Sequence, residues 1–263
     1  MSWSDKARFY TIHGERLPSV TTILGVIDKS GPLMHWAANM ERRAFESALL
    51  DVLTRDGAKD PDFVLTEMTK AVSGKKAFLR KQDEAAVIGT AAHALIEWHV
   101  RTMLGEKVGP EPRVPDGAMI AVESWKDWAK EVTFTPHTAE RTVHCWGCGY
   151  AGTLDWIADV RGVLTLGDWK TGKAIYPEAF LQNRAYRHAA SKLGLQTAQG
   201  MILRLPKTLE DPAFEAMVVP DMPMDDFLAA LRLWRWQRQM EGKTIGRAIE
   251  ARLSTPHTAR GVA

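Results

Sequence analysis

The stretch AGTLDWIADVRGVLTLGDWKTGK, residues 151–173, decides the fold. It predicts two short strands joined at Arg161–Gly162, with Asp155 on the first strand and Asp168 and Lys170 on the second. Because side chains alternate along a strand, Asp168 and Lys170 lie on the same face. A two-residue turn fixes the register and places Asp155 directly opposite Asp168. Two adjacent carboxylates repel each other, and a divalent cation would relieve that repulsion, so the segment indicates metal-dependent phosphodiester chemistry.

The preceding strand adds a third carboxylate. If a hairpin loop follows Cys145, this residue pairs with Tyr150, and Glu140 then faces Asp155. Three acids would form a row across three adjacent strands, provided that no bulge shifts the register. Carboxylate oxygens are ligands for Mg²⁺ or Mn²⁺, and one or two such ions would polarise a phosphate and activate water. Lys170, on the same face, can orient that water or neutralise charge on the phosphate.

The alternative for these acids is a solvated polar face, because acidic side chains on strands usually face water. We favour that interpretation for Asp159. Asp155 and Asp168 have apolar neighbours in the sequence, and aspartate is unfavourable in the centre of a strand. We therefore interpret these two residues, with Lys170, as a functional site.

The composition is that of a globular protein with a substantial core. The chain has 263 residues, of which 45% are hydrophobic and 25% charged. The net charge of +2 means that nucleic-acid binding would depend on local basic patches rather than on a global field. No run of about 18 apolar residues is present, and the N-terminus has no features of a secretory or transit peptide. We expect a cytoplasmic protein without membrane contacts.

The two cysteines lie in the segment Cys-Trp-Gly-Cys, residues 145–148. We interpret Cys145 and Cys148 as reduced thiols in a tight hairpin loop. A structural zinc site would need two more ligands, and His144 and His137 are the only candidates nearby in the sequence. An iron–sulfur cluster with four cysteine ligands is excluded within this chain.

The order of the expected elements predicts an α+β fold with a central mixed sheet flanked by helices. Helical patterns span residues 20–27, 33–53, 61–72, 83–104, 119–130, 177–193 and 224–240. Strand patterns span residues 132–134, 140–145, 150–160, 163–169, 197–204 and 214–219, and a short strand or hairpin lies near residues 8–15. We divide the chain into a helical N-terminal portion at 1–82, a core at 83–242 and a flexible basic tail at 243–263.

Five motifs occur in the order found in one known family. Gly-Thr-Leu-Asp at 152–155 and Gly-Asp-Trp-Lys-Thr-Gly at 167–172 match its G-x-x-D and D-x-K-T-G patterns. Upstream are Gly-Thr-Ala-Ala-His at 89–93 and the acid at Glu140, and downstream is Gln-Asn-Arg-Ala-Tyr at 182–186. The chain thus resembles the PD-(D/E)xK nuclease superfamily, and more narrowly its RecB-type exonuclease branch. Leu-Pro-Ser-Val-Thr at 17–21 is also similar to phage relatives and to the mitochondrial genome maintenance exonuclease.

The resemblance implies a restriction-endonuclease-like α/β/α core and assigns roles to the site residues. The implied metal ligands for one or two Mg²⁺ or Mn²⁺ ions are His93, Glu140, Asp155 and Asp168. The implied catalytic set is Asp155, Asp168, Lys170, Glu140, Gln182 and Tyr186. Without the motif, a histidine such as His93 is more often a core or surface residue, and Gln182 and Tyr186 are equally compatible with helix–sheet packing.

The helix over 177–193 and the segment before it are basic. We interpret Lys173, Arg184 and Arg187 as contacts to DNA phosphates, although a solvated helix face is equally ordinary. The helical N-terminal portion would form an arch over a DNA strand.

The function implied is a DNA exonuclease that acts on single-stranded or duplex ends in phage or bacterial recombination, repair or replication. It would work in the bacterial or host cytoplasm, without an iron–sulfur cluster and with a recombination or replication protein as a further partner. The alternatives are a structure-specific endonuclease on the same core and a catalytically silent DNA-binding module. The intact set of Asp155, Asp168 and Lys170 argues against the silent module, because degenerate members usually lose one of these residues. Polarity and oligomeric state are not defined by the sequence.

Overall fold

The fold is built on a mixed sheet with strand order β3-β4-β5-β6-β7. In a computed structural model, which describes residues 8–56 and 60–240, these strands are β3 (Phe134–Cys145), β4 (Tyr150–Val160), β5 (Val163–Thr171), β6 (Gln199–Leu205) and β7 (Glu215–Val218). The β5 and β6 strands are parallel and the other neighbours are antiparallel. The predicted α+β class with a central mixed sheet is confirmed.

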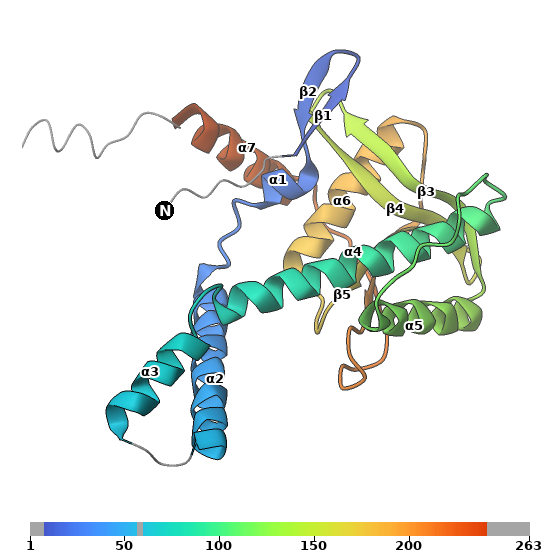
Figure 1. Cartoon of the computed structure of the whole chain (residues 1–263). Helices are drawn as coiled ribbons and strands as arrows, with labels where there is room; N and C mark the ends of the chain where they lie inside the picture. The colour runs from blue at the N-terminus through green and yellow to red at the C-terminus, as the bar shows by residue number, and fades with distance from the viewer. Residues whose placement is uncertain (1–7, 57–59, 241–263) are drawn as a thin grey trace, which may run out of the picture.

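Helices cover both faces of the sheet, giving three layers (Figure 1). On one face, α4 (Ala77–Met103) and α5 (Asp116–Val132) enclose a core rich in tryptophan. On the other face lie α1 (Val20–Leu24), α6 (Pro177–Lys192) and α7 (Asp225–Met240). Because both faces are covered, β4 and β5 are buried almost along their whole length. A polar side chain in the middle of either strand is therefore removed from bulk water.

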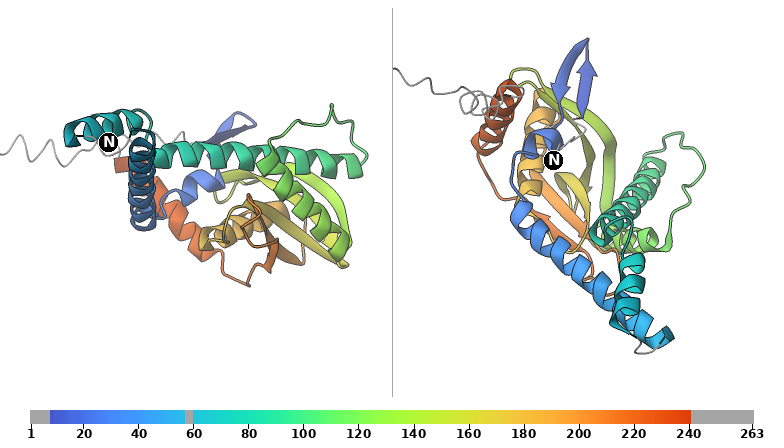
Figure 2. Two further views of the ribbon diagram at one scale, coloured as in Figure 1. Left: turned by 60° about the horizontal axis from the view of Figure 1, so that its bottom comes forward. Right: turned by 60° about the vertical axis from the view of Figure 1, so that its left-hand side comes forward.

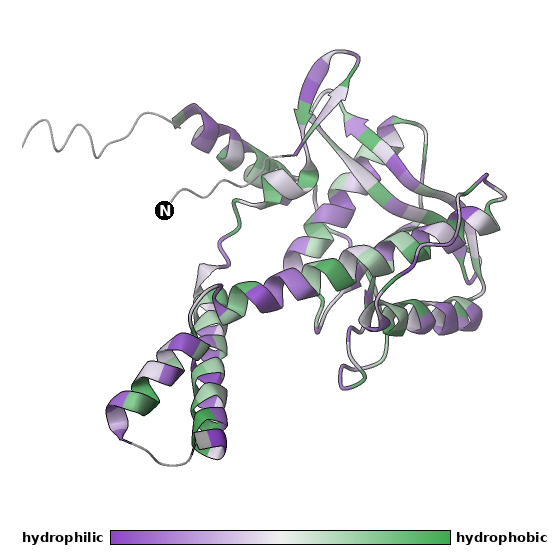
Figure 3. Cartoon of the chain, in the orientation of Figure 1, coloured by the Kyte–Doolittle hydropathy of each residue, from purple (hydrophilic) through white to green (hydrophobic). Residues whose placement is uncertain are grey.

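The N-terminal portion combines a small sheet with projecting helices. The strands β1 (Phe9–Ile12) and β2 (Glu15–Pro18) form a hairpin, where a short strand or a hairpin was expected. Ser19 caps α1 by accepting a hydrogen bond from the amide of Thr22 at 3.0 Å. Beyond α1, the helices α2 (Ser30–Asp56) and α3 (Pro61–Ala71) extend away from the sheet (Figure 2). Apolar residues remain exposed along them (Figure 3).

Most of the expected elements agree closely with the structure. The helix expected from residue 83 begins earlier, so the boundary between 82 and 83 falls inside the continuous helix α4. The tail at 243–263 lies outside the described residues. Within the described part of the chain, no helix is both long enough and apolar enough to cross a bilayer.

Two expected strands, 132–134 and 140–145, are joined in the single strand β3. The segment Thr135–Thr138 has no hydrophobic residues, so the alternation that indicates a strand is interrupted there. The register against β4 shifts between Pro136 and Thr138, so a bulge lies at His137. This bulge lies before Glu140, and the register shows no further shift from Ala139 to Cys145. The predicted pairing of Cys145 with Tyr150 is confirmed.

The hairpin between β4 and β5 has the predicted two-residue turn. Val160 pairs with Val163, and Arg161 and Gly162 have positive φ angles of 51° and 79°. A turn with two such residues matches the twist of the flanking strands and fixes their register. That register continues without a shift to the pair of Trp156 with Gly167.

Gly167 gives a test of how this register is packed. A Cβ atom added at this position would lie 1.7 Å from the ring of Trp156, which is fully buried. We expect Gly167→Ala to lower the free energy of unfolding by about 3 kcal/mol, because the tryptophan has no space into which to move. Urea denaturation measures this loss. Gly109→Ala is the control, since nothing lies within 4 Å of its added Cβ atom, and an equal loss in both variants would contradict the packing argument.

Candidate active site

Asp155 and Asp168 occupy the end of the β4–β5 ladder. The last paired residues are Trp156 and Gly167, so the two aspartates are the next opposed position in the register. Here the backbone pairing gives way to a side-chain contact, in which the amide of Trp169 donates to Asp155 Oδ2 at 2.7 Å. Asp168 is fully buried. The structure thus brings the two predicted acids together where the strands separate.

Glu140 completes the row on β3. Its position is bracketed by the pairs Ala139 with Trp156 and Arg141 with Leu154, which places it opposite Asp155 as predicted. Its φ angle is +47°, a left-handed conformation that is uncommon for a residue with a side chain. Such backbone strain tends to persist where the surrounding structure imposes a particular side-chain position.

Lys170 and Gln182 both contact Asp168. The ammonium group of Lys170 pairs with Asp168 Oδ2, and Gln182 Nε2 donates to Asp168 Oδ1 at 3.0 Å. Gln182 comes from α6, so one carboxylate is contacted from its own strand and from the covering helix. The side chain of Lys170 remains 33% exposed and can meet a molecule that enters from solvent.

Tyr186 lies one helical turn after Gln182, and its hydroxyl is 3.3 Å from Gln182 Nε2. Its ring packs on Gly152, where an added Cβ atom would lie 2.3 Å from the ring. The pKa of Tyr186 is raised well above its ordinary value, because burial and the nearby carboxylates of Asp168 and Asp155 disfavour the phenolate. Tyr186 therefore acts as a neutral hydrogen-bonding group beside the acids.

His93 reaches the same site from α4. Its ring meets the ring of Trp169 edge-on, with 6.1 Å between centroids. Burial lowers the pKa of His93 to about 4, with a smaller lowering effect from Lys170 and Lys207 that the nearby charge of Asp168 opposes. The imidazole is therefore neutral at physiological pH, which is the form that binds metal ions.

The electrostatics of the acids are unfavourable without a cation. Burial, followed by the charge of Asp168, raises the pKa of Asp155 well above its ordinary value. Burial and the charge of Glu97 raise the pKa of Glu140 to about 7. For Lys170, burial favours the neutral amine, but Asp168 and Asp155 outweigh it and raise its pKa. A positive ion beside these acids would restore their charged forms.

The ligand atoms of the predicted metal site lie farther from one another than those of a second group of potential metal ligands. Among the residues that the structure describes, three such side chains have ligand atoms within 4.8 Å of one another only at Cys145, Cys148 and His188. The two histidines nearest in the sequence do not join the thiols: His137 contacts Asp159 Oδ2 at 2.8 Å, and the ring of His144 meets the ring of Trp146 edge-on. His188 joins the thiols instead, forty residues after Cys148.

The predicted phosphate contacts differ in their surroundings. Lys173 is exposed just after β5. Arg184 donates to the carbonyl of Met222 at 2.9 Å, and Arg187 donates to the carbonyls of Thr197 and Ala198. Both arginines thus hold neighbouring loops, and a role for all three cations in DNA binding stays a prediction.

Lys207 is a site residue that sequence patterns missed. It follows β6, and its Nζ donates to the carbonyl of Ala85 on α4 at 2.8 Å. It lies near enough to His93 to lower the pKa of that imidazole. A single lysine in a loop, between Pro206 and Thr208, carries no signal of this position.

Comparison with known proteins adds little to this geometry. No family model matches the chain, and no curated protein matches it. A solved structure titled "Crystal structure of SSO0001" matches over 57% of this chain and 73% of that chain, with 10% sequence identity and a TM-score of 0.30. A TM-score this low carries no argument, so the resemblance to PD-(D/E)xK nucleases stays a prediction.

The raised pKa of Glu140 predicts how the stability of the metal-free protein depends on pH. The unfolded chain loses the proton near the ordinary value of 4.5, whereas the folded protein keeps it up to about 7. Stability from this group is therefore complete below pH 4.5 and is lost as the pH rises to about 7. Glu140→Gln removes the titrating group, so we expect this loss of stability to be smaller in the variant by on the order of 1–2 kcal/mol. The figure is less than the full pKa shift would give, because solvent screens part of the effect.

Urea denaturation in EDTA at pH 5 and pH 8 measures this difference. The control is Glu111→Gln, a change of the same kind outside the acidic row. An unchanged pH dependence in Glu140→Gln would contradict the assigned environment.

Proposed function

We propose that this chain is a metal-dependent deoxyribonuclease that hydrolyses phosphodiester bonds from DNA ends. The single observation that carries the proposal is the contact between the buried carboxylate of Asp168 and Lys170, with Asp155 at the next opposed position of the sheet. Two acids and an ammonium group at the point where two strands separate fit the binding and cleavage of a phosphodiester.

The donor set suits a hard divalent cation. Glu140, Asp155 and Asp168 supply carboxylate oxygens, and His93 supplies a neutral imidazole nitrogen. The raised pKa values of Asp155 and Glu140 support the fit, because a cation removes the repulsion that causes part of each shift. When bound, Mg²⁺ or Mn²⁺ would polarise the scissile phosphate and supply an activated water.

The chain's own residues position this chemistry. Gln182 fixes one oxygen of Asp168, which leaves Lys170 to compete with a cation for the other. Once displaced toward solvent, the ammonium group of Lys170 can orient water or neutralise negative charge on the phosphate. Tyr186, neutral and packed on Gly152, accepts a hydrogen bond from Gln182 Nε2 and so holds Gln182 in place.

The preference for DNA ends is supported by the RecB-type motifs and by the projecting helices α2 and α3, which extend beyond the sheet on the N-terminal side of α4 (Figure 1). A strand that enters beside α4 would meet Lys207, His93 and then the acids. The setting proposed is bacterial or phage recombination, repair or replication in the cytoplasm.

Substitution of Lys170 tests the proposal. We expect Lys170→Ala and Asp168→Asn to reduce cleavage of linear DNA in Mg²⁺ or Mn²⁺ by roughly 10²–10⁴-fold, because each removes charge from the reaction centre. Release of nucleotides from end-labelled single strands and duplexes measures the rate. Lys130→Ala, an exposed lysine on α5, is the control and should keep full activity.

The choice of substrate separates the competing functions. Linear molecules should be degraded and closed circles should persist. Degradation of closed circles would instead assign an endonuclease. Absence of cleavage together with absence of Mg²⁺ or Mn²⁺ binding would assign a DNA-binding module.

A further inference from the structure

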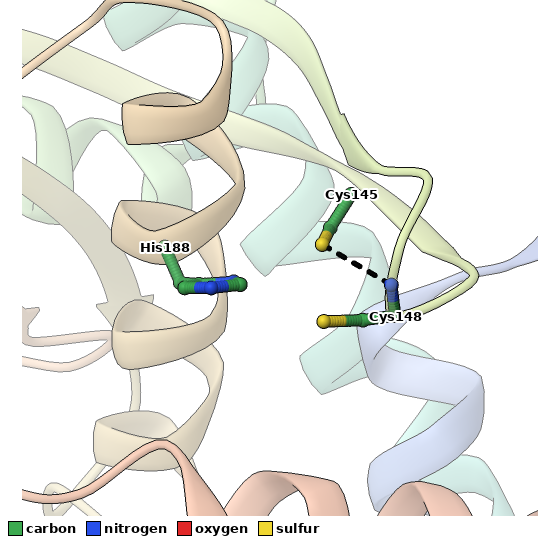
Figure 4. Close-up of side chains that lie close together, drawn as sticks. All are labelled: Cys145, Cys148 and His188. Atoms are coloured by element: carbon green, nitrogen blue, oxygen red, sulfur yellow. Dashed lines mark hydrogen bonds between the residues drawn. The ribbon is translucent and has the colours of Figure 1, made fainter.

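The tip of the β3–β4 hairpin presents two thiols to helix α6. Cys145 is the last residue of β3, and Cys148 lies in the turn that leads to β4. Both sulfur atoms face His188, whose ring points from α6 toward them (Figure 4). One ligand atom from each of the three residues lies within 4.8 Å of the others. Sequence spacing alone does not connect the histidine to the cysteines, so this cluster is a product of the fold.

The loop backbone holds the two thiols on the same side. The amide of Cys148 donates to Cys145 Sγ at 3.3 Å, a contact that ties the second cysteine of the loop to the first. Gly149 donates to the carbonyl of Cys145 at 2.7 Å and has a φ angle of +73°, a conformation in which glycine is favoured. From α7, Arg235 Nη2 donates to the carbonyl of Cys148 at 2.6 Å. The loop is thus fixed by its own backbone contacts and by α7 before any ligand binds.

Hydrogen bonding also selects the form of the imidazole. The hydroxyl of Tyr150 donates its one hydrogen to the carbonyl of Ala185 at 2.9 Å. The Tyr150 oxygen also lies 3.0 Å from His188 Nδ1. Because its hydrogen is already used, this oxygen can only accept a hydrogen bond from the imidazole, so Nδ1 carries the proton. The lone pair is left on Nε2. A metal-binding histidine has the same arrangement, with one nitrogen held by a neighbouring group and the other free.

The charge states agree with this picture. Burial, with added effects of Lys192 and Arg184, lowers the pKa of His188 and keeps its ring neutral. Burial and the neighbouring Cys145 raise the pKa of Cys148 to about 11. Two thiolates this close would repel each other strongly, and a cation between them would relieve the repulsion.

We propose that Cys145, Cys148 and His188 bind one thiophilic divalent cation, Zn²⁺ in the cell, with the fourth position open to water or another ligand. Two sulfurs and an imidazole suit Zn²⁺ far better than Mg²⁺ or Mn²⁺, so this site differs in chemistry from the acidic row. Binding would release two protons, one from each thiol, and form two metal–sulfur bonds and one metal–nitrogen bond. The ion would join the hairpin tip to α6. This site does not depend on the proposed nuclease activity.

Cobalt substitution tests the site directly. Reduced protein, stripped of metal, is titrated with Co²⁺ in the absence of oxygen, and Zn²⁺ is then added in competition. We expect one Co²⁺ per chain with a sulfur-to-cobalt charge-transfer band, and displacement by Zn²⁺. Cys148→Ser should lose much of this band, and His188→Ala should lose tight binding. His144→Ala should keep both, because its ring meets the ring of Trp146 edge-on rather than joining the cluster.

A second variant separates ligand geometry from folding. Tyr150→Phe keeps the buried ring but removes the oxygen that holds His188 Nδ1, and we expect Zn²⁺ affinity to fall roughly 10–100-fold with an unchanged circular dichroism spectrum. No cobalt band in the reduced wild-type protein would overturn the proposal. So would a band that survives His188→Ala, or a chain that binds no metal and oxidises to a Cys145–Cys148 disulfide. Lys170→Ala should bind Co²⁺ normally, so loss of nuclease activity leaves this test intact.

Discussion

The repulsion between Asp155 and Asp168 is the constraint on which the rest of the site depends. Placing two carboxylates next to each other in a covered sheet is costly unless each has partners. The fold supplies them: the Trp169 amide for Asp155, and Lys170 with Gln182 for Asp168. These partners come from the strand and from α6, so the site requires both the end of the ladder and the helix above it. The cost that remains appears as the raised pKa of Asp155, and a divalent cation would remove it.

The glycines near these acids have a packing reason. At Gly152 the ring of Tyr186 occupies the space of a side chain, and at Gly167 the ring of Trp156 does so. One glycine brings α6 close to the carboxylates, and the other allows the tryptophan core to lie directly beneath them. A rigid core below and a helix above hold the acids in a fixed geometry, which a reaction centre needs. The same residues that define the sequence motif therefore also determine the spacing between layers.

Local patterns predicted the parts of the fold that depend on neighbouring residues. The turn at Arg161–Gly162 and strict alternation fix the opposition of Asp155 and Asp168, because no bulge intervenes. The continuous strand β3 was not predicted, since its bulge at His137 interrupts the alternation. The left-handed backbone of Glu140 has no sequence signal, because glutamate rarely adopts it. The family resemblance placed His93, Gln182 and Tyr186 beside the acids, but the positions of Lys207 and His188 depend on packing between layers, which spacing along the chain does not encode.

The cluster of Cys145, Cys148 and His188 is another arrangement that only the packing between layers reveals. It also connects the two proposed metal sites through α6. His188 lies on the same helix as Gln182 and six positions after it, which is about 9 Å along the axis. A cation at the hairpin tip would hold one end of this helix against β3 and β4, the strands that carry Glu140 and Asp155. Helix α6 would then be held both at His188 by the cation and at Gln182 by Asp168, which would fix the position of Gln182. A soft-metal site at the tip would in this way stabilise a hard-metal site in the centre of the same sheet, without sharing a ligand with it.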